Sequence, residues 1–155
     1  MLSRIRLEAE RKSVEIRYCS PKLLPRVRMD KGKITFAVNN VMCNAMHYTP
    51  EGGRLDVAIR VQMRRRKGKP HPFVILSVAD TGPGVPSERV PFLFKPVQKM
   101  GCPGDSGHEL GLVISKRILT KHGGKITLDR KYTRGARFVI SLPAETNEST
   151  RCQPS

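Results

Sequence analysis

A seven-residue stretch, Asp-Thr-Gly-Pro-Gly-Val-Pro at residues 80–86, constrains the fold more than any other part of the chain. It follows the apolar run 73–79, which is typical of a buried strand. Two glycines and two prolines directly after a strand predict a sharp bend. Asp80 places a carboxylate at the strand end, where it can accept a hydrogen bond from an amine, and Gly82 and Gly84 let the backbone pass a flat ligand. Taken alone, the stretch is explained better by an ordinary turn.

Two further blocks flank this stretch. The first is Asn-Val-Met-Cys-Asn-Ala-Met-His-Tyr-Thr-Pro at residues 40–50, and the second is Gly-His-Glu-Leu-Gly-Leu at residues 107–112. In this order the three blocks resemble the N, G1 and G2 boxes of the ATP-binding domain of sensor histidine kinases. That domain belongs to the gyrase, heat-shock-ninety, histidine-kinase and MutL superfamily of ATPases. The resemblance covers about residues 7–143.

The expected fold is a two-layer α/β sandwich, the Bergerat ATP-binding fold that the resemblance implies. In it, about three helices cover one face of a mixed sheet of about five strands. We expect residues 1–13 to be the end of a linker from a dimerisation hairpin that the chain lacks. Residues 14–143 should form the ATP-binding domain, and the polar residues 144–155 a disordered tail.

The segment 31–47 has a helical pattern, with Asp30 as a plausible N-cap. Its apolar face comprises Ile34, Val38, Val41 and Ala45, and its opposite face carries Asn40, Asn44 and His47. A polar stripe of this kind is often only a solvated face. Amide oxygens one turn apart are also suitable ligands for Mg²⁺.

The resemblance assigns Asn40 and Asn44 to Mg²⁺, His47 to the phosphates and Tyr48 to the base of the nucleotide. Hydrolase members of the superfamily carry a water-activating carboxylate at the position of Asn40. An amide there favours a kinase over a hydrolysing ATPase. The resemblance also gives Asp80 the adenine amine, with Gly82 and Gly84 beside the base.

The remaining segments predict strands and one more helix. Residues 14–18 and 54–63 alternate as strands do, residues 64–72 should form a hairpin loop, and residues 73–79 should return as the antiparallel partner. A helix is expected at residues 110–121, with Leu110, Val113, Ile114 and Ile118 facing inward and a glycine cap at His122-Gly123-Gly124. Residues 125–128 and 137–142 should form a closing hairpin.

The segment Leu-Phe-Lys-Pro at residues 93–96 resembles the F box of the family. The resemblance places Phe94 at the hinge of a mobile lid that runs to about residue 106. Lys95 and Lys99 are positioned to reach phosphates from this lid, although lysines in loops are usually only solvated.

The third block should bind phosphate, because a glycine-rich turn that opens a helix points free backbone N–H groups at an anion. The resemblance assigns this role to six consecutive residues: Gly107, His108, Glu109, Leu110, Gly111 and Leu112. The family has a glycine where Glu109 stands. Its carboxylate would repel a triphosphate by up to about 4 kcal/mol at 4 Å, less in a wet loop. We therefore expect ATP binding to be weakened.

Composition constrains the kind of partner and the cellular environment of the protein. The formal net charge of +16 indicates an anionic partner, and residues 64–69 hold five cations without an aromatic residue for base stacking. Four cysteines without CxxC spacing, at Cys19, Cys43, Cys102 and Cys152, predict reduced thiols in an intracellular protein. No apolar run in this sequence is long enough to span a membrane. A parent protein bound to a membrane through another segment is compatible with this observation.

The resemblance predicts the catalytic domain of a sensor histidine kinase. It would bind Mg·ATP and transfer phosphate to a histidine on a separate dimerisation domain, with a downstream response regulator as the further partner. None of His47, His71, His108 and His122 has the context of a phosphoacceptor. The alternative is a degenerate relative that binds nucleotide weakly or not at all and acts in regulation or protein interaction. Nucleic-acid binding through residues 64–69 is a third, weaker hypothesis.

Overall fold

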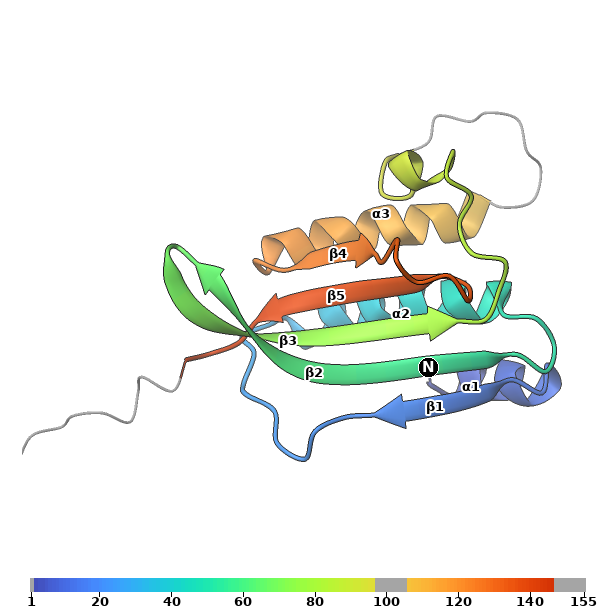
Figure 1. Ribbon diagram of the computed structural model, residues 1–155, viewed down its shortest axis with the longest axis horizontal. Coiled ribbons are helices and arrows are strands. Elements are labelled where there is room, and N and C mark those ends of the chain that lie inside the picture. The colour runs from blue at the N-terminus through green and yellow to red at the C-terminus, as the bar shows by residue number, and fades with distance from the viewer. Residues whose placement is uncertain (1, 97–105, 147–155) are drawn as a thin grey trace, which may run out of the picture.

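The computed structural model describes residues 2–96 and 106–146, and within them it has one mixed sheet and three α-helices on one face of it (Figure 1). The sheet order is β1-β2-β3-β5-β4, with β1 parallel to β2 and the other neighbours antiparallel. The elements are α1 Leu2–Arg11, β1 Glu15–Cys19, α2 Lys31–Tyr48, β2 Arg54–Arg66, β3 Lys69–Asp80, η1 Val90–Phe92, α3 Ser106–Lys121, β4 Lys125–Leu128 and β5 Arg137–Pro143. The predicted two-layer α/β sandwich is confirmed.

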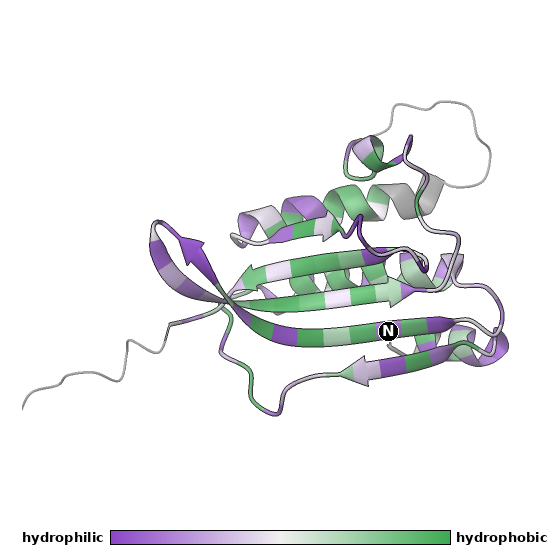
Figure 2. Ribbon diagram, in the orientation of Figure 1, coloured by the Kyte–Doolittle hydropathy of each residue, from purple (hydrophilic) through white to green (hydrophobic). Residues whose placement is uncertain are grey.

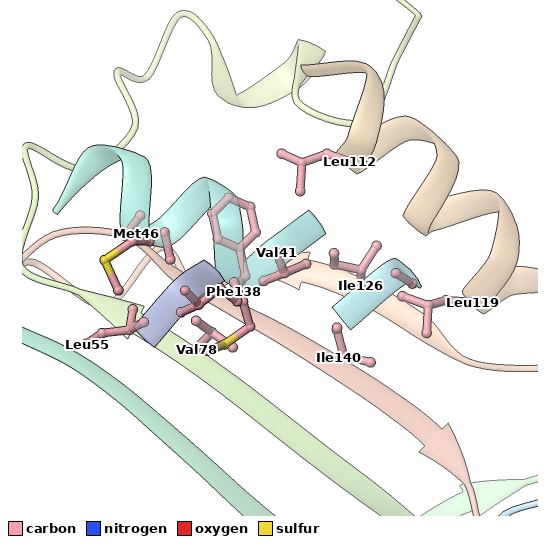
Figure 3. Close-up of a cluster of buried hydrophobic side chains, with 14 of the residues drawn as sticks. Val41, Met46, Leu55, Val78, Leu112, Leu119, Ile126, Phe138 and Ile140 are labelled. Atoms are coloured by element: carbon pink, nitrogen blue, oxygen red, sulfur yellow. The ribbon is translucent and has the colours of Figure 1, made fainter. Parts of the chain in front are cut away.

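The core lies between α2 and the middle of the sheet. Val41 of α2 is fully buried against a cluster that includes Leu55, Val78 and Phe138 from three neighbouring strands (Figure 3). Burying side chains of this size contributes about 1.5–3 kcal/mol each. This packing fixes α2 over the sheet and thereby sets the position of the polar residues that α2 carries.

Helix α2 begins and ends as its sequence indicates. The Asp30 carboxylate accepts a hydrogen bond from the Lys33 N–H at 3.1 Å, which confirms the predicted N-cap. At the other end, the Lys12 Nζ donates to the carbonyl oxygens of Met46 and His47, at 2.9 and 3.2 Å. The ammonium group satisfies carbonyls that the helix itself leaves unpaired.

The predicted inward face of α3 is partly wrong. Leu110 is 57% exposed, whereas the buried stripe runs through Leu112, Ser115 and Leu119. A serine in this stripe hid the true period from an apolar pattern. Ser115 tolerates burial because its hydroxyl lies 2.7 Å from the Gly111 carbonyl oxygen, one turn earlier.

The predicted hairpin loop 64–72 is also wrong. Strand β2 continues to Arg66 and β3 resumes at Lys69, so only Lys67 and Gly68 turn, with φ of 50° and 78°. Two consecutive positive φ angles are those of a two-residue hairpin turn. The basic residues therefore lie on strands, in a ribbon that projects past the end of β5 (Figure 1).

The segments outside 14–143 contact the domain. Ile5 and Ala9 of α1 are buried in the common core. The Ala144 N–H donates to the Pro72 carbonyl oxygen, and the Glu145 N–H donates to the Arg26 carbonyl oxygen.

None of the described helices combines the length and the hydropathy that crossing a membrane requires.

Candidate functional site

The three blocks from the sequence meet at one end of the sheet. A Cβ built at Gly82 would lie 2.5 Å from the Tyr48 carbonyl oxygen, so the loop after β3 packs directly on the end of α2. The Asn40 Nδ2 donates to the Gly111 carbonyl oxygen at 3.2 Å, which ties α2 to α3. Asn40 and Gly111 are about 70 residues apart in the chain. Distant segments thus share one site.

Only one of the two carboxylate oxygens of Asp80 accepts hydrogen bonds from the described residues. The residue is 2% exposed. Its Oδ1 accepts hydrogen bonds from the Gly82 N–H at 2.8 Å and from the Ala136 N–H at 3.1 Å. Burial raises the pKa of this carboxyl, and the two N–H groups oppose that rise. Oδ2 has no hydrogen-bond partner within the described part of the chain. The carboxylate keeps one oxygen for an amine.

The loop between β4 and β5 positions Asp80, a role that the sequence analysis missed. The Tyr132 hydroxyl donates to the Asp80 carbonyl oxygen at 3.2 Å, and the Arg137 guanidinium stacks on the Tyr132 ring at 4.2 Å. Gly135 packs against the same carboxylate, because any Cβ there would overlap the Asp80 backbone. The only signal in the sequence was a glycine between two strands, which a simple turn explains equally well.

Replacing Gly135 by Ala should destabilise the domain. The added methyl group would overlap backbone atoms of Asp80, and overpacking a tight site costs about 1–3 kcal/mol of unfolding free energy. Urea unfolding followed by circular dichroism measures this loss. Gly32→Ala is the matched control, since its Cβ meets only Asp30 Oδ1 at an ordinary 3.5 Å. Equal stability of both variants would contradict the proposed packing of the loop.

The polar stripe of α2 is more buried than its pattern predicts. Asn44 is only 7% exposed and has no hydrogen-bond partner among the residues that the structure describes. Its amide atoms are not among the fully buried atoms without a partner, so the amide reaches the surface and is open to an external ligand. Asn40, in contrast, is half-buried, and its Nδ2 also lies 3.3 Å from the Ser115 hydroxyl. Its amide group therefore joins two helices as well as facing the site.

The remaining residues of the N box lie at the end of α2. His47 is exposed, and its ring meets the Tyr48 ring edge-on at 4.9 Å between centroids. Gly84 has φ of 77°, which favours glycine, and it lies beside the Gly135 carbonyl oxygen. These contacts place the loop after β3 between α2 and the β4–β5 loop.

Phe94 packs into the domain at the start of the predicted lid. Its ring meets that of Phe138 edge-on at 6.3 Å, and the Lys116 Nζ lies 5.9 Å from its centroid. Lys95 lies over the Phe92 ring at 5.7 Å. Lys99 lies outside the described residues.

The G2 block opens α3. The backbone of residues 106–109 is helical, whereas the exposure of Gly107 and the side chains of His108 and Glu109 lie outside what the structure describes. Leu110 is exposed, and Leu112 belongs to the core. Leu112 therefore supports the site by packing, while Gly111 leaves room for Asn40, whose Oδ1 would lie 3.2 Å from a Cβ there. No group of three or more His, Cys, Asp or Glu residues suited to a metal ion occurs in the described chain.

Known proteins resemble this arrangement. The sensory kinase SasA of Gloeothece citriformis is 33% identical to this chain. The matched region covers 86% of this chain but only 33% of the length of SasA. The catalytic domain of the histidine kinase ThkA superposes with a TM-score of 0.73 at 23% identity, covering 92% of this chain and 86% of that chain. Full-length ShkA, solved in complex with AMPPNP, gives 0.69 at 27% identity, covering 93% and 28%.

The family model of histidine kinase-, DNA gyrase B- and HSP90-like ATPases matches residues 29–146. This range includes all three blocks, the F box and the β4–β5 loop that holds Asp80. The structural likeness to ThkA agrees with the mixed sheet and three helices described above. The chain therefore belongs to the family of histidine kinase-, DNA gyrase B- and HSP90-like ATPases.

Proposed function

We propose that this chain is the catalytic domain of a sensor histidine kinase and binds Mg·ATP between α2, the loop after β3 and the start of α3. One observation carries the proposal. Asn44 and Asp80 are both buried at the same end of the domain, and each keeps an oxygen without a partner in the described chain. Neither oxygen is among the fully buried side-chain atoms without a partner, so both reach the surface and are open to a ligand that supplies the missing contacts.

The donor set fits the two ends of Mg·ATP. The amide oxygens of Asn44 and Asn40 are hard, neutral ligands that would hold Mg²⁺, and the Asp80 Oδ2 would accept from the adenine amine. Bound Mg²⁺ would neutralise charge on the phosphates. The backbone N–H groups at the start of α3 suit the phosphates, with His47, Lys95 and Lys99 as further contacts. ShkA, which is similar in structure, was solved in complex with AMPPNP, and this supports nucleotide binding by the present chain.

Phosphoryl transfer would require a second domain. SasA and KinB, the sensor protein of Pseudomonas aeruginosa, are about three and five times as long as the matched region, which covers 33% and 19% of them. We propose that the parent kinase carries the phosphoacceptor histidine on a dimerisation domain and passes phosphate to a response regulator. The role of the present chain is then to position the γ-phosphate and to shield its charge.

This division of labour predicts that the isolated chain does not phosphorylate itself. Incubation with radiolabelled Mg·ATP should leave it unlabelled, because the acceptor histidine lies on another segment. Addition of the cognate dimerisation domain should produce acid-labile phosphate on that domain alone. Label that maps to His47, His71, His108 or His122 would contradict the proposal.

Glu109→Gly should strengthen ATP binding. The change removes a carboxylate and a Cβ from the first turn of α3, and the screened charge accounts for roughly tenfold to thirtyfold in affinity. The gain should be smaller for AMP and should shrink at high salt. Isothermal titration of both nucleotides at two salt concentrations measures it.

The same titration decides between an intact and a degenerate domain. Strong binding by the unmodified chain, with no gain in the variant, means that Glu109 faces solvent and that the site is intact. A gain confined to ATP means that one residue weakens a phosphate site. Absence of ATP binding in both proteins would contradict the proposed function and support the degenerate alternative.

A further inference from the structure

The apolar stripe of β2 runs out from under the helices. Successive side chains of a strand point to opposite faces, so the five apolar residues at every second position lie on the face that α2 covers: Leu55, Val57, Ile59, Val61 and Met63. Leu55 is fully buried, Val61 is 42% exposed and Met63 is 60% exposed. The ribbon of β2 and β3 projects beyond the helical layer at this end (Figure 1). An apolar sheet face is thus left uncovered.

The loop between β1 and α2 completes a groove beside this face. Leu23 is 87% exposed and Leu24 is 43% exposed, and both line a groove of about 810 Å³ together with Val61 and Met63. Prolines of the loop and of β3 form much of the remaining wall. Adjacent exposed apolar side chains in a groove are typical of an interaction site, whereas isolated ones are not.

Cations are concentrated in the two segments that form this groove, and Arg26 is the one cation among its described lining residues. Residues 20–29 and 59–72 together hold nine lysines and arginines and no Asp or Glu. None of the nine forms an ion pair with a described residue. Glu145 is the one carboxylate among the described lining residues. Figure 2 shows the strongly hydrophilic tip of the ribbon next to the apolar strands. The groove therefore has a mostly apolar lining and lies between two strongly basic segments.

We propose that this groove binds an acidic segment of another protein through large apolar side chains that enter it and carboxylates that meet the cations of its two basic segments. The site lies at the opposite end of the sheet from Asp80, so binding leaves the nucleotide site free. A protein segment fits better than nucleic acid, because the described lining residues include leucine, valine, methionine and proline but no aromatic side chain for base stacking. Complementary charge would direct the encounter and the apolar groups would hold it.

A displayed library of random twelve-residue peptides tests the proposal. The full chain is the selection target, and the double variant Leu23→Ser/Met63→Ser is the counter-target. Selected peptides should carry net negative charge and at least two large apolar residues. Synthetic copies should bind the chain at least about tenfold more tightly than they bind the double variant, since each apolar group buried contributes about that factor.

Matched variants separate the apolar and the charged contributions. Leu7→Ser removes an exposed leucine from α1 and should leave peptide binding unchanged. Arg65→Glu should weaken it by about tenfold at low salt, and Lys125→Glu on β4 should not. Thermal melts check that every variant is folded.

Three outcomes would overturn the proposal. One is the absence of peptides enriched over the double variant, and a second is enrichment of peptides without acidic residues. The third is displacement of the selected peptides by a twenty-nucleotide oligonucleotide that binds the double variant equally well. That result would assign the surface to nucleic acid through its cations alone.

Discussion

Replacing Asn44 by Ala is expected to abolish the Mg²⁺-dependent part of ATP binding. Asn44 lies on α2 and has no hydrogen-bond partner among the described residues, and its oxygen is the ligand that we propose for the ion. Substitutions outside the metal's direct ligands already cost about 10–100-fold in affinity, so loss of a ligand should cost at least about a hundredfold. Calorimetric titration with ATP in Mg²⁺ and in EDTA measures the effect.

The fold should survive this change, because the variant removes a polar group that forms no hydrogen bond with a described residue. The melting temperature of Asn44→Ala should therefore stay close to that of the unmodified chain. Asn44→Asp should also abolish the Mg²⁺ effect, since it alters the charge of the ligand next to the phosphates. Asn39→Ala, the same change on the same helix outside the predicted ligand set, is the control. Retained Mg²⁺ dependence in both Asn44 variants would remove this residue from the site.

Asp80→Asn is expected to weaken ATP binding by about 10–100-fold and to reduce the preference for adenine over guanine. The Asn side-chain oxygen can still accept from the Gly82 and Ala136 N–H groups, so the loop keeps its contacts. The amide nitrogen would then face the adenine amine, and two donors would meet. Loss of a hydrogen bond to a charged group costs about 1.5–3 kcal/mol, which gives this range.

A matched pair of titrations with ATP and GTP tests this prediction. Asp56→Asn on the neighbouring strand β2 removes a carboxylate that pairs with Arg54 and should change neither affinity. Unchanged base preference in Asp80→Asn would show that this carboxylate does not recognise adenine. Asp80→Ala is less informative, because it also removes the acceptor of two backbone N–H groups and should destabilise the loop.

Periodicity and cap chemistry predicted most of the fold. The apolar positions of α2 and its Asp30 cap were correct because both are local properties of one helix. The strand that delivers Asp80 was correct because a buried run ended in residues that force a turn. The family resemblance then supplied the order in which these elements assemble.

The errors arose where tertiary packing, and not the local sequence pattern, determines which residues are buried or lie on strands. Ser115 is buried because Gly111 and Ala37 offer carbonyl oxygens, a fact that no apolar pattern encodes. The basic residues of β2 and β3 lie on strands because two turn residues adopt positive φ. The support that Tyr132 and Gly135 give to Asp80 depends on a contact more than 50 residues away in the chain, as the pairing of Tyr132 with Asp80 shows.

Titration of the chain with a fluorescent ATP analogue, with and without Mg²⁺, tests the central claim most directly. The proposed site predicts saturable binding that Mg²⁺ strengthens, that unlabelled ATP displaces more effectively than GTP, and that Asn44→Ala and Asp80→Asn each weaken. Fluorescence that does not saturate, or that is the same in EDTA and in both variants, would contradict the proposal that these residues form a Mg·ATP site.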